Sequence, residues 1–326
     1  MSRLMKALLL ALITLSAGSC SAFADWREDI GVFRVGIYTG QQPAGFLARS
    51  EPFRLALQEA IGMEVEFFPA SRTEALIDAL QTDRIEYALL SASAYALAWN
   101  VCECVEPLVV PRAGDSTDGF HTIMIVRQDG PKSLNDLAGK TVGELSPGSI
   151  SQGLVAKKLL EDAGVELEKV TFAHAGSGEA TLKAFLEGNY DALVGWSTMT
   201  GIASDGYSRG TLTSMAALGP DMLSGYRVLA KSMQIPHRPH VIRKKLPGEL
   251  KDILRSTLGA MYDQNAIAYD SIEPTYGGGF GTARHHRFEP LMDVLSGLAP
   301  QEEKLDPETV STIGDEAEPE TQNPPE

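Results

Sequence analysis

The chain has 326 residues, and its 28 Lys and Arg stand against 43 Asp and Glu, which gives a formal net charge of −15. Hydrophobic residues make up 44% and charged residues 22%, the composition of an ordinary globular protein. The acidic balance excludes a general nucleic-acid binder, because the phosphate backbone requires a basic surface. A small anion is not excluded, since aimed backbone N–H groups can hold one on an acidic protein.

The N-terminal segment has the pattern of an export signal. A short basic stretch precedes the apolar run 7–15, and the Ala-Phe-Ala sequence at 22–24 is a typical cleavage site. The run is too short to span a bilayer, which takes about 20 apolar residues. The sequence therefore predicts a signal peptide over residues 1–24 and a mature protein in the periplasm. Lipidation of Cys20 is the alternative, and the sequence leaves it open.

The first half of the chain alternates strands with helices. The expected elements are a strand over 34–38, a helix over 51–61, a strand over 63–68, a helix over 71–80 and a short strand over 87–90. Ser71 is the expected N-cap of the second helix, with Glu74 completing a capping box. This alternation is typical of a parallel sheet with helices on its faces.

The same order returns in the second half. The expected elements are a strand over 140–145, a turn over 148–153, a helix over 154–163, a strand over 170–173, a helix over 180–186 and a strand over 191–196. A C-terminal helical stretch over 246–269 opens at Pro247, and the acidic tail 301–326 is expected to be disordered. Length and pattern together predict an α/β protein with two domains.

Small polar residues gather in the turns that follow these strands. The turns are 39–41, 91–95, 149–152 and 177–179. In open α/β sheets, ligands bind beyond the carboxyl ends of the strands. The turns therefore predict a ligand site shared between the two halves of the chain.

The turn over 148–153 is the most informative of these. It follows a strand and opens a helix, so its N–H groups and the helix dipole favour a small anion. The hydroxyls of Ser149 and Ser151 can add two donors, while the plain alternative is that Ser149 only caps the helix. Leu154-Val155 stand where a P-loop has Lys-Ser/Thr, and 176–178 lack the third glycine of a dinucleotide fingerprint. No nucleotide cofactor is predicted.

Cys102 and Cys104 form a C-x-C pair in a chain predicted to enter an oxidising compartment. A local disulfide or a redox pair is the first interpretation. A soft thiolate site for trivalent arsenic or a soft metal ion is the second. The spacing of four zinc ligands is absent.

The histidines give no metal or catalytic site. The pairs His237-x-x-His240 and His285-His286 have no clear carboxylate partner in the sequence, so we expect surface histidines rather than metal ligands. No Gly-x-Ser-x-Gly elbow is present, and no nucleophile stands with recognisable partners. We therefore predict that the protein is not an enzyme and that it carries no cofactor.

Several segments together resemble one family. The chain is similar to the phosphate/phosphite/phosphonate group of periplasmic solute-binding proteins of ABC transporters across nearly all of residues 32–297. The matching segments are Arg34-Val35-Gly36, residues 87–95, residues 133–140, residues 148–153, Gly176-Ser177-Gly178-Glu179-Ala180, Ser232-Met233-Gln234-Ile235-Pro236 and Arg243-Lys244-Lys245-Leu246-Pro247. Each is short, and their order and spacing carry the resemblance.

The resemblance implies a type II periplasmic binding-protein fold with two lobes, a central cleft and a hinge. Lobe one is expected over 26–125 plus 227–300, and lobe two over 126–226. Ligand contacts from both lobes would favour a closed form that a membrane partner recognises. That partner is expected to be an ABC permease, and the alternative is a membrane sensor kinase in a sensory role, for example for arsenite.

The resemblance also implies site residues. The family's oxyanion turn falls on Ser149, Ile150 and Ser151, and its tyrosine after the third strand falls on Tyr95. A histidine common in phosphonate binders is replaced by Gly178, and Glu179 follows it, where it can hold the positive end of a zwitterion. The turns after the strands, read from the sequence itself, add Gln41, Ser91, Ser93 and Ser177 as expected ligand contacts. Tyr38 and Trp196 are expected to line the cleft, and the alternative for Trp196 is a core residue at the end of a buried strand. The predicted protein is a monomer that binds a small anion, with phosphonate, phosphite, phosphate, arsenite or an organic anion all open.

Overall fold

A computed structural model describes residues 25–40 and 43–296. These residues fall into two compact units, 25–32 and 33–296. The first unit is the short helix α2 (Trp26–Ile30), whose N-cap is Asp25 and which ends at Gly31 with φ +70°. The predicted signal peptide over 1–24, Cys20, Gln41 and the predicted tail over 301–326 lie outside the described residues.

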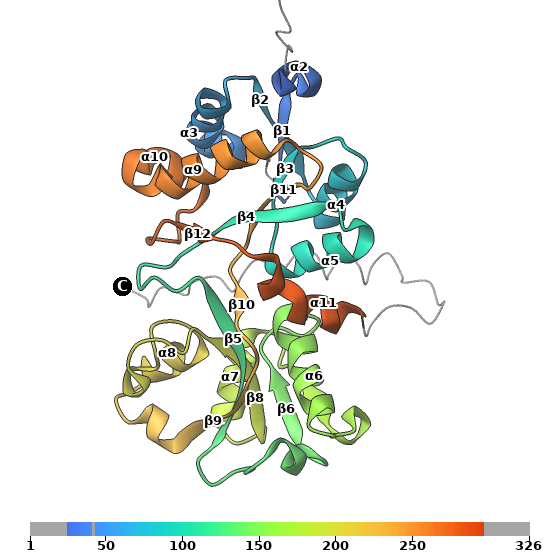
Figure 1. The fold of residues 1–326 in the computed structure, drawn as a ribbon. Helices are drawn as coiled ribbons and strands as arrows, with labels where there is room; N and C mark the ends of the chain where they lie inside the picture. The colour runs from blue at the N-terminus through green and yellow to red at the C-terminus, as the bar shows by residue number, and fades with distance from the viewer. Residues whose placement is uncertain (1–24, 41–42, 297–326) are drawn as a thin grey trace, which may run out of the picture. The chain divides into compact units, whose positions relative to one another are not determined.

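The second unit contains two six-stranded sheets, shown in Figure 1. The first has the order β12-β4-β11-β3-β1-β2, and the second has the order β10-β5-β8-β6-β7 with β9 paired to β5. The strands of the first sheet are β1 (Phe33–Tyr38), β2 (Val65–Ala70), β3 (Tyr87–Leu89), β4 (Val105–Pro111), β11 (His240–Arg243) and β12 (Phe280–Thr282). Those of the second are β5 (Gly119–Arg127), β6 (Thr141–Glu144), β7 (Thr171–Ala173), β8 (Ala192–Ser197), β9 (Tyr226–Lys231) and β10 (Ile235–Pro236).

Helices cover the first sheet. They are α3 (Pro43–Ile61), α4 (Thr73–Gln81), α5 (Ala92–Cys102), α9 (Gly248–Gln264), α10 (Ala266–Ile272), η7 (His285–Phe288) and α11 (Glu289–Ser296). Figure 1 shows α3, α9 and α10 on one face and α4 and α5 on the other. The parallel pairs β1–β2 and β1–β3 place the carboxyl ends of these strands at one edge of the sheet.

The second sheet has a core on each face. Its helices are α6 (Val155–Asp162), α7 (Gly178–Leu186) and α8 (Thr211–Ala216), with the short turns η2 (Leu134–Leu137), η3 (Ile150–Leu154), η4 (Leu167–Lys169), η5 (Ala203–Asp205) and η6 (Met222–Gly225). In β5, Met124 and Val126 join the α6 core, whereas Ile123 and Ile125 join the core formed by α7 and α8. Alternate strand residues point to opposite faces, so an uninterrupted apolar strand supplies both cores.

Two segments cross from one sheet to the other. The first runs from β4 to β5 and the second from β10 to β11, and they lie together where His237 N donates to Asp118 O at 2.9 Å. Because β5, β9 and β10 all belong to the second sheet, the change of sheet falls at 112–118 and 237–239. We keep the two-lobe division as a proposal, with its boundaries moved from 125/126 and 226/227 to these segments.

Local differences from the expected elements have physical reasons. The N-cap of α4 is Arg72, without a side-chain cap, so the capping box predicted at Ser71 is wrong. The C-terminal helical stretch divides into α9 and α10 at Asn265, whose side chain caps α10 by accepting from Ala268 N. Within the described part of the chain, no helix is long and apolar enough to cross a membrane.

Candidate ligand-binding site

The turn at the carboxyl end of β6 opens one continuous helix, which begins with the wide η3 turn and continues as α6. Gly148 precedes it with φ +83°, a conformation that favours glycine. Ser149 Oγ accepts the Gln152 N–H at 3.1 Å and lies 3.3 Å from Ser151 Oγ. Ser149 thus caps the helix, and its own hydroxyl proton can be donated to Ser151 or to a ligand.

The turn is covered by elements of both sheets. Ser149 and Ser151 are 5% and 8% exposed. The Ser151 carbonyl accepts the hydroxyl of Thr122 in β5. Segment η3 also contacts β8, α5 and α11. Two hydroxyls and a helix N-terminus therefore converge in a place from which water is largely excluded.

Apolar contacts bring part of the predicted site together. Ile150, Tyr95 and Phe120 belong to one buried cluster, and Trp196 packs against it. Trp196 and Phe120 make an edge-to-face contact with ring centroids 5.7 Å apart. Residues separated by about 100 positions in the sequence thus surround the Ser149–Ser151 turn.

A carboxylate that the sequence did not single out, Glu144, lies beside the turn. Glu144 ends β6, is 5% exposed, and its Oε1 would lie 3.3 Å from a Cβ placed on Gly153. Lys157 Nζ is 3.2 Å from the same oxygen and lies over the Phe172 ring. The lysine compensates a negative charge that would otherwise oppose an anion on the turn.

Predicted site residues of the first sheet are mostly held by protein groups. Ser91 caps α5 by accepting from Ala94 N at 3.0 Å, and Ser93 is 2% exposed. The Tyr95 ring is fully buried, and its hydroxyl lies 2.7 Å from His285 Nδ1. Burial raises the pKa of Tyr95, so its phenol stays neutral. In this conformation the tyrosine is bonded to protein.

The other predicted residues lie at strand ends or helix starts. Tyr38 ends β1 and is 38% exposed. Ser177 caps α7 by accepting from Ala180 N at 3.1 Å, and both Ser177 and Glu179 are exposed. Their roles stay predictions.

The histidines predicted at the surface include two that are buried. His237 is 3% exposed and His240 is fully buried, so that expectation is wrong for both. His240 Nε2 lies 2.8 Å from Glu273 Oε1, a carboxylate that the sequence pattern did not connect with it. Among residues 25–40 and 43–296, no group of three or more His, Cys, Asp or Glu is placed to hold a metal ion.

Cys102 and Cys104 are joined by a disulfide in the structure. The bridge encloses Glu103, which adopts φ +48° at the end of α5. Cys104 N also lies 3.3 Å from Cys102 Sγ. The pair therefore fixes the turn from α5 into β4.

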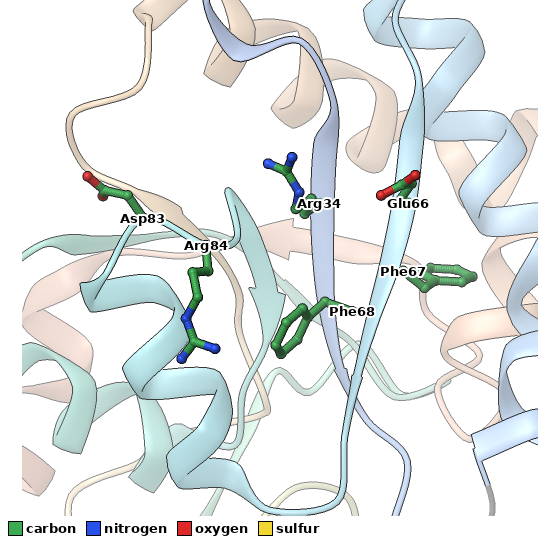
Figure 2. A pocket seen from close by; sticks show the side chains of 6 residues that line it. All are labelled: Arg34, Glu66, Phe67, Phe68, Asp83 and Arg84. Atoms are coloured by element: carbon green, nitrogen blue, oxygen red, sulfur yellow. The ribbon is translucent and has the colours of Figure 1, made fainter.

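A surface pocket of about 490 Å³ lies at the other edge of the first sheet, near the amino ends of its strands. Figure 2 shows its lining residues, Arg34, Glu66, Phe67, Phe68, Asp83 and Arg84. Arg84 pairs with Asp78, Arg34 lies 3.8 Å from Glu86, and Asp83 pairs with Arg243 and Lys245. With its arginines already paired and none of the predicted residues present, this pocket is not the candidate site.

Comparison with known proteins identifies the family. Residues 35–290 match the family model of periplasmic substrate-binding proteins of phosphonate ABC transporters. Among solved structures, XAC2383 from Xanthomonas citri bound to ATP is 16% identical with a TM-score of 0.57, covering 82% of this chain and 97% of that chain. PhnD1 from Prochlorococcus marinus in complex with methylphosphonate is 15% identical with a TM-score of 0.50, covering 82% and 98%. These likenesses confirm the predicted fold.

Proposed function

The chain belongs to the phosphonate family of periplasmic substrate-binding proteins of ABC transporters, and from this premise we propose that it captures a small phosphonate-like oxyanion at the Ser149–Ser151 turn. The family consists of substrate-binding proteins, so the prediction that the chain is not an enzyme is confirmed. Family members are periplasmic and work with permease and ATPase components. The ligand is the part that we propose.

One observation carries the proposal. The Ser149 and Ser151 hydroxyls lie 3.3 Å apart at the N-terminus of a helix that spans η3 and α6. Helix N-terminal N–H groups and the helix dipole favour negative charge. Two hydroxyls at this separation can reach two oxygens of one tetrahedral group. A ligand with that group fits the donors better than a flat, neutral solute does.

Ligand capture requires opening and closing. The turn is almost fully covered by α5, α11, β5 and β8, so a ligand enters only when η3 separates from the first-sheet helices. Motion at the crossing segments 112–118 and 237–239 would produce this separation. A ligand that contacts both sides shifts the population toward the closed form. The sensory alternative uses the same closed form and stays a prediction.

The test is calorimetric titration with methylphosphonate, phosphate, phosphite, arsenate and sulfate. Ser151→Ala removes one donor to a charged group and should weaken oxyanion binding by about 1.5–3 kcal/mol. Ser146→Ala is the matched control, because Ser146 is an exposed serine of the same loop. Unchanged affinity in Ser151→Ala would exclude the turn from the site. Reductant is included in a parallel titration with arsenite, where binding only after reduction would place the site at Cys102 and Cys104.

A further inference from the structure

Arg209 is a partly buried cation that forms no ion pair with any residue of the described ranges 25–40 and 43–296. Across the described ranges, neither an ion pair nor a hydrogen bond is found for its guanidinium, whose one ring contact is with Tyr276, at 5.5 Å from the ring centroid. The nearby carboxylate of Asp115 accepts the Thr117 N–H at 2.9 Å and acts on Arg209 only at longer range. A partly desolvated charge without a partner is unfavourable. In a chain of net charge −15, such a cation is a candidate contact for an anionic group of a ligand.

Arg209 and Trp196 emerge from neighbouring backbone. Ser197 and Gly210 form a β-bridge, and Thr198 N donates to Arg209 O at 3.2 Å. The Trp196 side chain then meets a ring of β5, and the Arg209 side chain meets a ring of the loop before β12. Trp196 contacts Phe120 at 5.7 Å, and Arg209 lies over Tyr276.

His237 lies between the Trp196–Phe120 contact and the Arg209–Tyr276 contact and connects them. Its ring is 6.4 Å from Phe120 and 4.8 Å from Tyr276, centroid to centroid. We name the set Trp196, Phe120, His237, Tyr276 and Arg209 the aromatic wall. Phe120, His237 and Tyr276 are at most 5% exposed, and the partly buried Trp196 and Arg209 are the first and last members of this series of ring contacts.

Two polar atoms of the wall, Trp196 Nε1 and His237 Nε2, bond to no group within residues 25–40 and 43–296. The Trp196 indole N–H has no hydrogen-bond partner in the part of the chain that the structure covers. His237 donates from Nδ1 to Pro111 O at 3.1 Å. Burial lowers the pKa of His237 to about 4, so at neutral pH its other nitrogen carries no proton and can only accept.

The aromatic wall adjoins the Ser149–Ser151 turn. Phe120 and Trp196 pack in the same cluster as Ile150 of that turn. Two positions after Phe120 on β5, Thr122 donates to the Ser151 carbonyl. An inorganic oxyanion on the turn would leave the aromatic faces and Arg209 without a partner. A longer molecule can satisfy both.

We propose that the ligand is an organic phosphonate with a second anionic group, held by its phosphonate at the Ser149–Ser151 turn and by a carboxylate at Arg209, with its carbon chain on the aromatic wall. This inference rests on the proposed function and names the ligand class of the same site. A guanidinium suits a carboxylate because its planar donors bind both oxygens. The ring faces suit the intervening methylene groups.

The experiment titrates the purified protein with pairs of phosphonates of equal length. Phosphonoacetate, 3-phosphonopropionate and 4-phosphonobutyrate are each compared with the alkylphosphonate that has the same number of carbon atoms. We expect the carboxylate member to bind at least about 10-fold more tightly at one chain length, as for a hydrogen-bonded charge pair. Arg209→Gln should abolish that preference, and Arg209→Lys should keep part of it.

Arg49→Gln is the matched control, because Arg49 is an exposed arginine over an aromatic ring, 5.1 Å from the Phe46 centroid. It should keep the full preference. Equal affinity of both members at every length, with both weakened in Ser151→Ala, would overturn this inference and leave the proposed function standing. No binding of any phosphonate would overturn both. A preference that survives in Arg209→Gln would place the carboxylate elsewhere.

Discussion

His237 should make the protein markedly less stable in mild acid. Its ring is 3% exposed, contacts the rings of Phe120 and Tyr276, and donates to Pro111 O at 3.1 Å. Burial is the main reason that its pKa falls from 6.5 to about 4. The positive charge of Arg209 lowers the pKa of His237 further. The negative charges of Asp118 and Glu273 raise that pKa, but by less than burial lowers it.

The sign and size of the effect follow from linkage. The unfolded chain takes up a proton on this histidine below pH 6.5, whereas the folded chain does so only near pH 4, so acid favours unfolding between these values. At pH 5 the unfolded histidine is almost fully protonated and the folded one is about nine-tenths neutral. The resulting loss of stability relative to pH 7.5 is about 2 kcal/mol, and it approaches about 3 kcal/mol below pH 4.

The assay is urea unfolding at pH 7.5 and pH 5.0 for the natural protein and His237→Asn. Asparagine keeps a donor near the position of Nδ1 but does not titrate. The difference in unfolding free energy between the two pH values should therefore be about 2 kcal/mol smaller in the variant. His286→Asn, at an exposed histidine, should leave that difference unchanged. Equal pH dependence in His237→Asn and the natural protein would refute the reasoning.

Two further substitutions test the buried polar contacts. Glu273→Gln should lower the free energy of unfolding by about 3 kcal/mol in a urea titration, because Arg238 and His240 both bond to a fully buried carboxylate; a loss below about 0.5 kcal/mol would contradict this. Tyr95→Phe should lower it by about 1 kcal/mol through the lost contact with His285 at 2.7 Å and leave methylphosphonate affinity unchanged. A tenfold loss of that affinity would instead support the ligand contact predicted for Tyr95.

Much of the fold can be predicted from local sequence. The strands expected over 34–38 and 191–196 are mainly apolar after a charged first residue, and they occur as β1 and β8 with bounds that differ by one residue. Helix α5 shows no amphipathic period, because most of its first seven residues are buried on every side. Hydrophobic periodicity detects a helix that has one solvent-exposed face, so it does not detect a helix that is alanine-rich and buried on all sides.

The candidate site also contains residues that local sequence predicts and residues that only the fold brings together. Ser149 and Ser151 were predictable, because a glycine turn after a strand and before a helix is a local pattern. Arg209 and Tyr276 were not, since 67 positions separate them and only the fold brings the guanidinium over the ring. His237 was predicted at the surface because flanking prolines indicate a loop. That loop is a crossing segment, which the two sheets bury.

The Glu144–Lys157 pair gives a last prediction about the oxyanion turn. Glu144 is 5% exposed beside the turn, and Lys157 Nζ lies 3.2 Å from its Oε1. Lys157→Met would leave that carboxylate uncompensated, and an added unit charge roughly 7 Å from the ligand would oppose each ligand charge by about 1–2 kcal/mol. Methylphosphonate affinity should therefore fall about 5- to 30-fold in calorimetric titration.

Lys158→Met is the control for this prediction, because Lys158 is the adjacent lysine, its side chain is 41% exposed, and it pairs with Asp162. The double variant Glu144→Gln with Lys157→Met removes both charges and should recover most of the affinity. Such recovery attributes the loss to the uncompensated carboxylate, since disrupted packing around Lys157 would persist in the double variant. Equal affinities in the Lys157 and Lys158 variants would show that Glu144 does not act on the ligand. Oxyanion binding at the Ser149–Ser151 turn would then be independent of Lys157.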